Sequence, residues 1–514
     1  MIELLYRGVG PGLLGALLLL GGFSCGPTAL AVEVGEARPL DPFGIGANGN
    51  LSGFDRPWEN EELLAAFKEL GLRHLRYPAG TLGNYWDWDI GWIDPTVPDS
   101  LMIGWVVENK LPQSSHRYTL ENLALLTEAT GAAPIFMLNM LSKDLEHSLR
   151  NLRRADRLGM PVRYVELGNE LYFDLPFPKL RYPTPEDYGR TCERWIVAIR
   201  AEFPKAKFAV IGSYLEVHPR QQDWTARVLR HCPSADAVTY HKYTPSGLDG
   251  RMVRRNVQPG EEGRGNPYTA TRTAPENMLQ RQGWEREQLR DPAAYANLLT
   301  TARKGARGWR EVHPPPELEV WATEFNMRDD SSVVLNSWAQ AMLLSVYYGE
   351  FYQSPVTVTT IHNLTGSLFG LLYTDPSLTD YLLDQPREVT LFAPTAAGVI
   401  TSLFAKSSAG ASRCRPLRYP KAPVLTDDRA ADFPSVAGYW FSGVGEAALL
   451  VNYGLTAVTV QVPDSLPATQ ATTYRAPLER TVVGWRDVDH TTTYSLNGTL
   501  TLPPTSITQL SVNP

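Results

Sequence analysis

Short apolar runs alternate with amphipathic stretches over most of this chain. Each run spans about four to eight residues and is closed by polar residues, a pattern typical of buried parallel strands. The stretches between them carry helix-capping residues, such as Gly71 after residues 59–70 and Thr184 before Pro185. Eight strands alternating with helices predict an α/β fold, a closed (β/α)8 TIM barrel. The expected strands are residues 43–48, 72–78, 133–140, 163–170, 207–212, 235–241, 318–326 and 356–363.

The pattern changes near residue 407. Short strands separated by turn residues follow, with no long helical pattern. This arrangement predicts a C-terminal antiparallel β-sandwich. We therefore expect residues 41–406 to form the barrel, and residues 407–514, joined by residues 32–40, to form a β-sandwich accessory domain.

The N-terminus has the pattern of an export signal. Arg7 precedes an apolar run at residues 13–20, and Ala29-Leu30-Ala31 matches a small-x-small cleavage site. Residues 1–31 are therefore predicted to be a signal peptide, which would make the protein secreted or periplasmic. Lipid attachment at Cys25 is the alternative, and it is the one case in which we expect the protein to be anchored to a membrane.

Composition narrows the classes of partner. With 43% hydrophobic and 20% charged residues the chain resembles an ordinary globular protein, and its net charge of −7 gives no reason to expect nucleic acid. No phosphate loop, dinucleotide fingerprint or metal-ligand spacing appears, so neither a cofactor nor a metal is expected. Whether Cys192 and Cys232 meet in a disulfide, and the oligomeric state, stay open.

Polar residues close all eight expected strands, and functional residues of a TIM barrel lie at these ends. Glu170 and Glu324 close strands four and seven, which lie nearly opposite each other. Retaining glycosidases use two carboxyl groups about 5–5.5 Å apart across the scissile bond. The pair therefore predicts a retaining glycosidase. The strand ends are Asn48, Arg76, Asn139, Asn169 with Glu170, Ser213, His241, Glu324 and Asn363.

Other side chains at the strand ends suit the same chemistry. The phenol of Tyr243 and the charge of Arg76 are expected to keep Glu324 ionised. Asn169 is suited to bond a sugar 2-hydroxyl. Glu166, on the same strand face as Glu170, is expected to form an ion pair inside the barrel. Further candidates for sugar contacts are His241, His362, Asn48, Asn363, Trp86, Trp88 and Trp321, the last expected on the opposite strand face from Glu324.

Several of these motifs resemble a known group of enzymes. They are Gly168-Asn169-Glu170, the turn at residues 76–80, His241-Lys242-Tyr243, Thr323-Glu324-Phe325-Asn326 and the ending at residues 502–508. Together they resemble the clan A retaining glycoside hydrolases, above all the family 51 α-L-arabinofuranosidases and the family 79 β-glucuronidases and heparanases, with family 39 more distant. The resemblance implies a cofactor-free hydrolase of plant or microbial polysaccharides or oligosaccharides. It also implies that Glu170 is the acid/base and Glu324 the nucleophile.

The same residues also fit activities that differ from an arabinofuranosidase-like hydrolase. A β-glucuronidase or heparanase-like enzyme would need cations near the sugar carboxylate. Lys242 follows His241, and since strand alternation gives the inward face to His241 and Tyr243, an outward direction for Lys242 is equally open. The insertion at residues 244–290 contributes Arg251, Arg254, Arg255 and Arg264. A transglycosylase would use the same two glutamates, and a non-catalytic carbohydrate-binding protein could be built on the same barrel.

Overall fold

A computed structural model of the 514-residue chain describes most of it. The described residues are 29–40, 44–49, 58–110, 117–215, 217–245, 248, 275–309, 315, 317–328, 332–366, 369–374, 387–427, 431–494, 496 and 498–511. Residues 1–28 of the expected signal peptide, Cys25 included, and the four arginines of the insertion lie outside these ranges, so export, lipid attachment and the role of those arginines stay predictions. Within the described ranges, no helix is both long and apolar enough to span a membrane.

The eight predicted strands close into a parallel barrel, which confirms the predicted fold class. Each strand pairs with the next in sequence, and the last, β12, pairs with the first, β3. In chain order they are β3 (Ile45–Asn48), β4 (His74–Tyr77), β7 (Ala133–Met137), β8 (Tyr164–Glu166), β9 (Lys207–Ile211), β10 (Ala237–Pro245), β11 (Glu319–Arg328) and β12 (Val356–Ile361).

One main helix follows each barrel strand. The capping residues act as predicted: Gly71 ends α1 in the left-handed conformation, with φ of 71°, and Thr184 forms a capping box at the start of α6. The eight helices are α1 (Glu61–Leu70), α3 (Leu120–Thr130), α4 (Leu145–Arg157), α6 (Pro185–Glu202), α7 (Trp224–Leu229), α11 (Pro292–Arg307), α12 (Trp338–Phe351) and α13 (Ala396–Ser407).

The long connections hold elements that the sequence pattern did not predict. They comprise β5 (Trp86–Asp87), β6 (Trp92–Ile93), α2 (Gly104–Glu108), α5 (Pro176–Arg181), α10 (Pro275–Arg290) and the 3-10 helices η1 (Thr81–Tyr85) and η2 (Asp99–Leu101). The segment after β4 matters most, because Asn84 of η1 contacts the turn after β8 and Trp86 of β5 contacts Tyr77 of β4.

The C-terminal region forms antiparallel sheets, as predicted. Its largest sheet has the order β1-β13-β16-β17-β22-β19-β20, and β18 with β21, and β14 with β15, form two-stranded sheets. The strands are β13 (Ala411–Arg418), β14 (Val424–Thr426), β15 (Asp432–Pro434), β16 (Val436–Gly443), β17 (Glu446–Asn452), β18 (Val458–Gln461), β19 (Gln470–Arg475), β20 (Asp489–Tyr494), β21 (Thr499–Leu502) and β22 (Ser506–Ser511).

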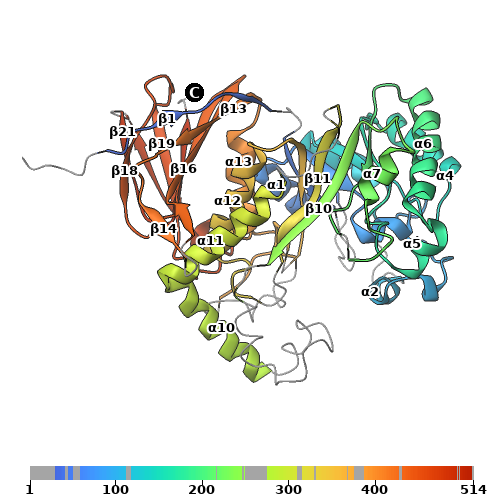
Figure 1. Cartoon of the computed structure of the whole chain (residues 1–514), viewed down its shortest axis with the longest axis horizontal. Coiled ribbons are helices and arrows are strands. Elements are labelled where there is room, and N and C mark those ends of the chain that lie inside the picture. Colours follow the sequence, from blue (N-terminus) through green and yellow to red (C-terminus); the bar gives the residue numbers. More distant parts are fainter. Residues whose placement is uncertain are drawn as a thin grey trace, which may run out of the picture.

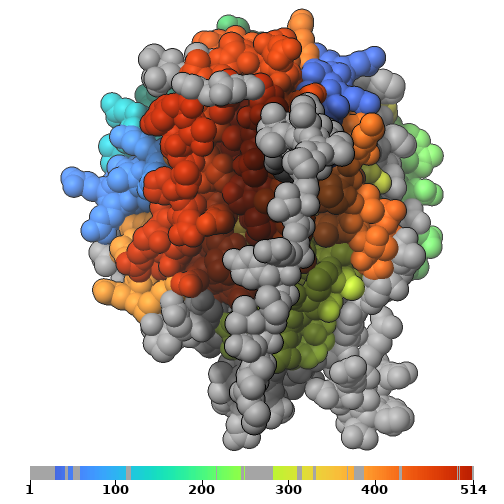
Figure 2. All heavy atoms as spheres, turned by 90° about the vertical axis from the view of Figure 1, so that its left-hand side faces the viewer, coloured from blue at the N-terminus to red at the C-terminus, as the bar shows by residue number. Residues whose placement is uncertain are grey.

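The N-terminal strands belong to this second region. β1 (Glu33–Val34) and β2 (Arg38–Pro39) both pair with β13, so the chain begins on the sheet edge before it enters the barrel. Figure 2 shows this end of the molecule, where orange and red residues form most of the visible coloured surface and a blue N-terminal patch lies at its upper right.

Helix α12 joins the barrel to the antiparallel sheet. All fourteen of its residues are buried, and in Figure 1 α11, α12 and α13 lie between the sheet and the barrel strands β10 and β11. On the sheet side Trp338 donates its indole N–H to the Thr505 carbonyl (2.7 Å) and Ser345 donates to the Tyr453 hydroxyl (3.0 Å). On the barrel side Phe325 of β11 packs on Phe351 at 4.8 Å between ring centroids. The helix is mostly apolar around its whole circumference, as expected of a helix buried between two layers.

Two cysteines that the sequence left unconnected are neighbours. Cys192 of α6 and Cys232, which follows α7, are buried free thiols that interact with each other. Burial raises the pKa of Cys192, and the Cys232 thiol raises it further.

Candidate functional site

A β-bulge on β11 sets which side chains enter the barrel mouth. Tyr240 of β10 lies opposite Ala322, but His241 lies opposite Glu324, so Thr323 is an extra residue on β11. In a regular strand, neighbouring side chains point to opposite faces. At this bulge the side chains of Thr323 and Glu324 both point into the barrel. The expectation that Trp321 faces away from the barrel interior is therefore wrong. Trp321 is fully buried with Ile135, Ala209, Ala237 and Val358 in a separate core layer.

The centre of the site is the guanidinium of Arg76, at the end of β4. It is fully buried and forms an ion pair with Glu166. Its Nε–H donates to Glu166 Oε2 (2.5 Å), and its Nη2–H donates to Glu166 Oε1 (2.9 Å). Nη2 also donates to Asn169 Oδ1, and Nη1 donates to Asn48 Oδ1 and Glu324 Oε1, each at 2.8 Å. The predicted pairing of Glu166 inside the barrel and of Arg76 with Glu324 is thus observed. Asn48 supports this arrangement rather than lining an open surface, since it is fully buried and its Nδ2 donates to the Thr323 carbonyl.

Glu324 is held in its ionised form. Its Oε2 accepts a hydrogen bond from the Tyr243 hydroxyl at 2.7 Å, as expected from the sequence. His241 Nδ1 and His362 Nδ1 lie 3.7 and 3.9 Å from the same oxygen. Burial alone would raise the pKa of Glu324, but His241, His362, Arg76 and the Tyr243 hydrogen bond together lower it to about 2. At neutral pH Glu324 is therefore a carboxylate.

Glu170 lies outside the strand that was expected to carry it. β8 ends at Glu166, and the chain then turns through Gly168 (φ 91°) to Glu170 (φ 47°). The expectation that Glu166 and Glu170 share a strand face is therefore wrong. A left-handed glutamate costs roughly 1–2 kcal/mol and persists where its surroundings fix it. Here the Asn84 side chain donates to the Asn169 carbonyl (2.7 Å) and accepts from the Asn169 amide (3.1 Å).

His241 lies between the two glutamates. Its Nδ1 is 3.1 Å from Glu170 Oε1, and its Nε2 is 3.1 Å from the Thr323 hydroxyl, which itself donates to Glu166. Burial would lower the pKa of His241, but Glu324, Glu166 and Glu170 raise it to about 9. One carboxylate oxygen each of Glu170 and Glu324, and one ring nitrogen of His241, all lie within 4.8 Å of one another.

Two predicted side chains keep polar atoms available for a ligand. Among the described residues, the buried Asn169 Nδ2 and Asn363 Oδ1 have no hydrogen-bond partner, and the same holds for the Nδ1 atoms of His241 and His362. Asn169 Nδ2 is a donor and Asn363 Oδ1 an acceptor. Buried polar atoms of this kind usually have a partner, so a hydroxylated ligand is a natural one.

Three other candidates have their described contacts outside the glutamate cluster. Trp86 donates its indole N–H to the Tyr77 hydroxyl (3.3 Å) and packs on Trp92, and Trp88 packs on Tyr77. Both indoles are buried and pack in the core of the segment after β4. Lys242 points outward, the direction that strand alternation had left open, with its ammonium 5.7 Å from the ring centroid of Tyr214 and next to Gly308 at the end of α11.

Asn84 and Tyr172 were not predicted from the sequence. Tyr172 donates its hydroxyl to Glu170 Oε1 at 3.1 Å. Neither residue closes a strand, and no spacing links Asn84 to the turn that it holds. The one signal in the sequence that could have identified Tyr172 is its position two residues after Glu170.

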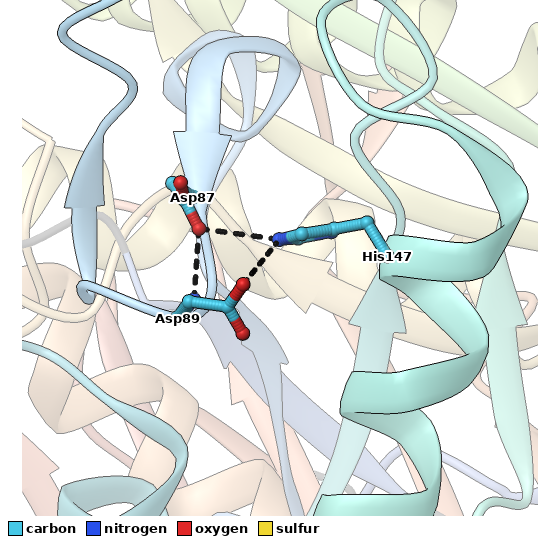
Figure 3. A group of neighbouring side chains, drawn as sticks. All are labelled: Asp87, Asp89 and His147. Atoms are coloured by element: carbon cyan, nitrogen blue, oxygen red, sulfur yellow. Dashed lines mark hydrogen bonds and ion pairs between the residues drawn. The ribbon is translucent and has the colours of Figure 1, made fainter.

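A second cluster with metal-ligand residues is an ion-pair network. Figure 3 shows His147 of α4 pointing at Asp87 and Asp89. Lys143 lies 2.7 Å from Asp87, and Arg150 lies 2.5 Å from Asp89, so cations already neutralise both carboxylates. Burial alone would raise the pKa of Asp87, but the hydrogen bonds from His147 and Lys143 lower it. This network fastens the segment after β4 to α4.

Comparison with known proteins identifies the fold. No protein-family model matches the chain. A probable α-L-arabinofuranosidase C of Aspergillus clavatus is 24% identical over 219 residues, which are 36% of this chain and 40% of that protein. The match thus spans less than half of the length of that relative.

Solved structures match over nearly the whole chain. The α-L-arabinofuranosidase of Thermotoga maritima, in complex with arabinose, has a TM-score of 0.62 at 15% identity over 94% of this chain and 99% of that one. The family 51 arabinofuranosidase of Xanthomonas axonopodis pv. citri also gives 0.62, at 16% identity over 94% and 100%. A 4-O-α-L-rhamnosyl-β-D-glucuronidase of Fusarium oxysporum gives 0.54 at 12% identity, again over 94% and 100%. The chain therefore shares the fold of these enzymes, and in this chain that fold is a TIM barrel with antiparallel sheets.

The charge on His241 should make stability depend on pH. The pKa of His241 is about 9 in the folded protein against an ordinary 6.5, so the folded state binds the proton more tightly. This stabilisation is complete below about pH 6.5 and is lost as the pH rises through about 9. In thermal unfolding followed by circular dichroism, the midpoint of the wild type should fall over this window more than that of His241→Asn. His218→Asn, at an exposed position, should follow the wild type; equal pH slopes in wild type and His241→Asn would contradict the assignment of the charge.

Proposed function

We propose that this protein is a retaining glycoside hydrolase with Glu324 as nucleophile and Glu170 as acid/base. The observation that carries the proposal is the opposed glutamate pair, whose oxygens approach within 4.8 Å while Glu324 is kept ionised. Retaining enzymes need carboxyl groups about 5–5.5 Å apart, whereas inverting enzymes separate them by about 6.5–9.5 Å to admit a water molecule. The short separation supports the double-displacement route.

In the first step Glu324 attacks the anomeric carbon, and Glu170 gives its proton to the departing oxygen. A covalent glycosyl-enzyme forms, and Glu170 is left as a carboxylate. In the second step Glu170 takes a proton from water, which attacks the anomeric carbon and releases Glu324. Arg76 and Tyr243 each hold one oxygen of Glu324, so the nucleophile is oriented before substrate arrives. The Asn169 amide donor lies beside this pair and is suited to a sugar hydroxyl.

For the substrate, we propose a neutral glycan, with α-L-arabinofuranosides first. Arg76 directs its N–H groups to protein acceptors, and Lys242 points away from the barrel interior. Among the described residues, the imidazolium of His241 is the remaining cation next to Glu170 and Glu324, and both glutamates already face it. A uronate would need a further positive partner. The names of the arabinofuranosidases with the same fold support the same choice.

Replacing either glutamate should separate their roles. Glu324→Ala should abolish turnover, because no other described carboxylate accompanies Glu170 in this cluster. Glu170→Ala should still form the glycosyl-enzyme from 2,4-dinitrophenyl glycosides, whose leaving group needs no proton, and added azide should restore turnover as a glycosyl azide of retained configuration. Rates measured by absorbance and the product configuration determined by NMR test these two roles. Azide rescue of Glu324→Ala in place of Glu170→Ala would reverse the roles, and two fully active variants would refute the pair.

The turn at Gly80 should tolerate no side chain. A Cβ at Gly80 would lie 2.2 Å from Glu324 Oε1, the oxygen that Arg76 holds, so Gly80→Ala must displace the nucleophile. We expect kcat/KM to fall by about 100-fold, because misplacing a reacting group by about 1 Å has an effect of that order. Gly104→Ala, where a Cβ meets nothing within 4 Å, is the matched control. Unchanged kinetics of Gly80→Ala would show that Glu324 is not the reacting group.

A parallel substrate panel tests the sugar. Initial rates on aryl α-L-arabinofuranoside, β-xyloside, β-glucoside, β-galactoside and β-glucuronide should be highest for the arabinofuranoside. A preference for the glucuronide, lost when Arg251, Arg254, Arg255 and Arg264 are replaced by Ala, would instead assign a glucuronidase-like enzyme. Binding of these sugars without turnover would assign a carbohydrate-binding protein, and transfer to added acceptor sugars would assign a transglycosylase.

A further inference from the structure

The two oxygens of Glu170 have different surroundings. Oε1 accepts the hydrogen bond from Tyr172 at 3.1 Å and lies 3.1 Å from His241 Nδ1. Among the described residues, no hydrogen bond or ion pair reaches Oε2. The side chain is 16% exposed, so one oxygen is engaged by the protein and the other is open.

Tyr172 is firmly held in place. Its ring is 3% exposed and packs on Phe173, with 4.8 Å between centroids, and edge-on to Trp224 at 6.2 Å. The main chain around it is tied down as well, because Arg220 donates to the carbonyls of Leu171 (2.6 Å) and Phe173 (2.9 Å). Burial, and then the nearby Glu170, raise the pKa of the Tyr172 hydroxyl well above its ordinary value, so it remains a donor.

We propose that Tyr172 is a positioning residue that keeps the acid proton of Glu170 on Oε2, the oxygen open to substrate. When the carboxyl group is protonated, a hydrogen on Oε1 would give up the hydrogen bond that this oxygen accepts from Tyr172 and would lie beside the His241 ring nitrogen 3.1 Å away, so Oε1 is the less favourable oxygen for it. The hydrogen therefore occupies Oε2. This inference rests on the proposed function, because it gives a role to Tyr172 only if Glu170 is the acid/base.

The same contact contributes to the chemical step. As the glycosidic C–O bond breaks, its electron pair goes to the leaving oxygen, and the proton on Oε2 moves to that oxygen. Negative charge then develops on Glu170, and a hydrogen bond to a charged acceptor is about twice as strong as one to a neutral acceptor. The Tyr172 bond thus strengthens in the transition state, which is the condition for lowering the activation free energy rather than only binding substrate.

The effect of removing this hydroxyl should depend on the leaving group. For Tyr172→Phe we expect kcat/KM to fall about 10- to 100-fold on phenyl glycosides, which need the proton, and by less than about twofold on 2,4-dinitrophenyl glycosides, which do not. The probes are the phenyl and 2,4-dinitrophenyl glycosides of the sugar with the highest kcat/KM in the panel. Tyr182→Phe is the matched control, since Tyr182 is another buried tyrosine, whose hydroxyl donates to the Met140 carbonyl (2.8 Å) away from the glutamates. It should affect both substrates alike.

A second measurement separates a positioning role from loss of folding. In a Glu170→Ala background the change Tyr172→Phe should leave the rate on the 2,4-dinitrophenyl glycoside unaltered, because Tyr172 then has no carboxylate to act through. Equal losses on both leaving groups, or a further loss in that background, would make Tyr172 merely structural and overturn the inference. Full activity of Tyr172→Phe on phenyl glycosides would overturn it too. A wild-type protein that hydrolyses none of the aryl glycosides would instead overturn the proposed function, and this inference with it.

Discussion

The buried guanidinium of Arg76 is the interaction on which the site depends. A charged group costs several kcal/mol to bury unless it is paired and hydrogen-bonded. Five hydrogen bonds meet that requirement here, to Glu166, Asn48, Asn169 and Glu324. These partners lie on or just after β3, β8 and β11, so one side chain of β4 connects four parts of the barrel. Breaking a buried ion pair by removing one partner costs about 3–5 kcal/mol, which makes this contact a strong constraint on the geometry.

The charges around Arg76 explain why Glu324 stays ionised. Two cations, Arg76 and the imidazolium of His241, face the buried carboxylates Glu166 and Glu324. Glu166 is saturated by Arg76 and by the hydroxyls of Thr239 and Thr323, so it balances charge inside the barrel without reaching a ligand. Glu324 keeps the same cations within reach at the barrel mouth, where a substrate can approach. One buried carboxylate therefore serves the fold, and the other is the proposed nucleophile.

The sequence predicted the barrel well because strand and helix periods are local signals. Apolar runs ending in polar residues located all eight strands, and the strand ends located Arg76, His241, Tyr243 and Glu324. The sequence-based prediction was wrong where tertiary contacts override the alternation of side chains along a strand. The bulge at Thr323 and the left-handed Glu170 depend on neighbours distant in sequence, such as Asn84, which is 85 residues away from Asn169. The sequence also showed no sign of the ion pairs beside Trp86 and Trp88, in which Asp87 pairs with Lys143 and Asp89 with Arg150.

The two glutamates are held by different kinds of structure, and the difference matches their proposed roles. Glu324 projects from a ten-residue central strand, β11, with both oxygens engaged by Arg76 and Tyr243. A nucleophile gains from such rigidity, since it attacks one atom from one direction. Glu170 follows a turn, and the structure fixes its main chain through Asn84 and one oxygen through Tyr172. Its second oxygen remains open, and an acid that later becomes a base needs that opening, because the leaving group and the attacking water must reach the same oxygen in turn.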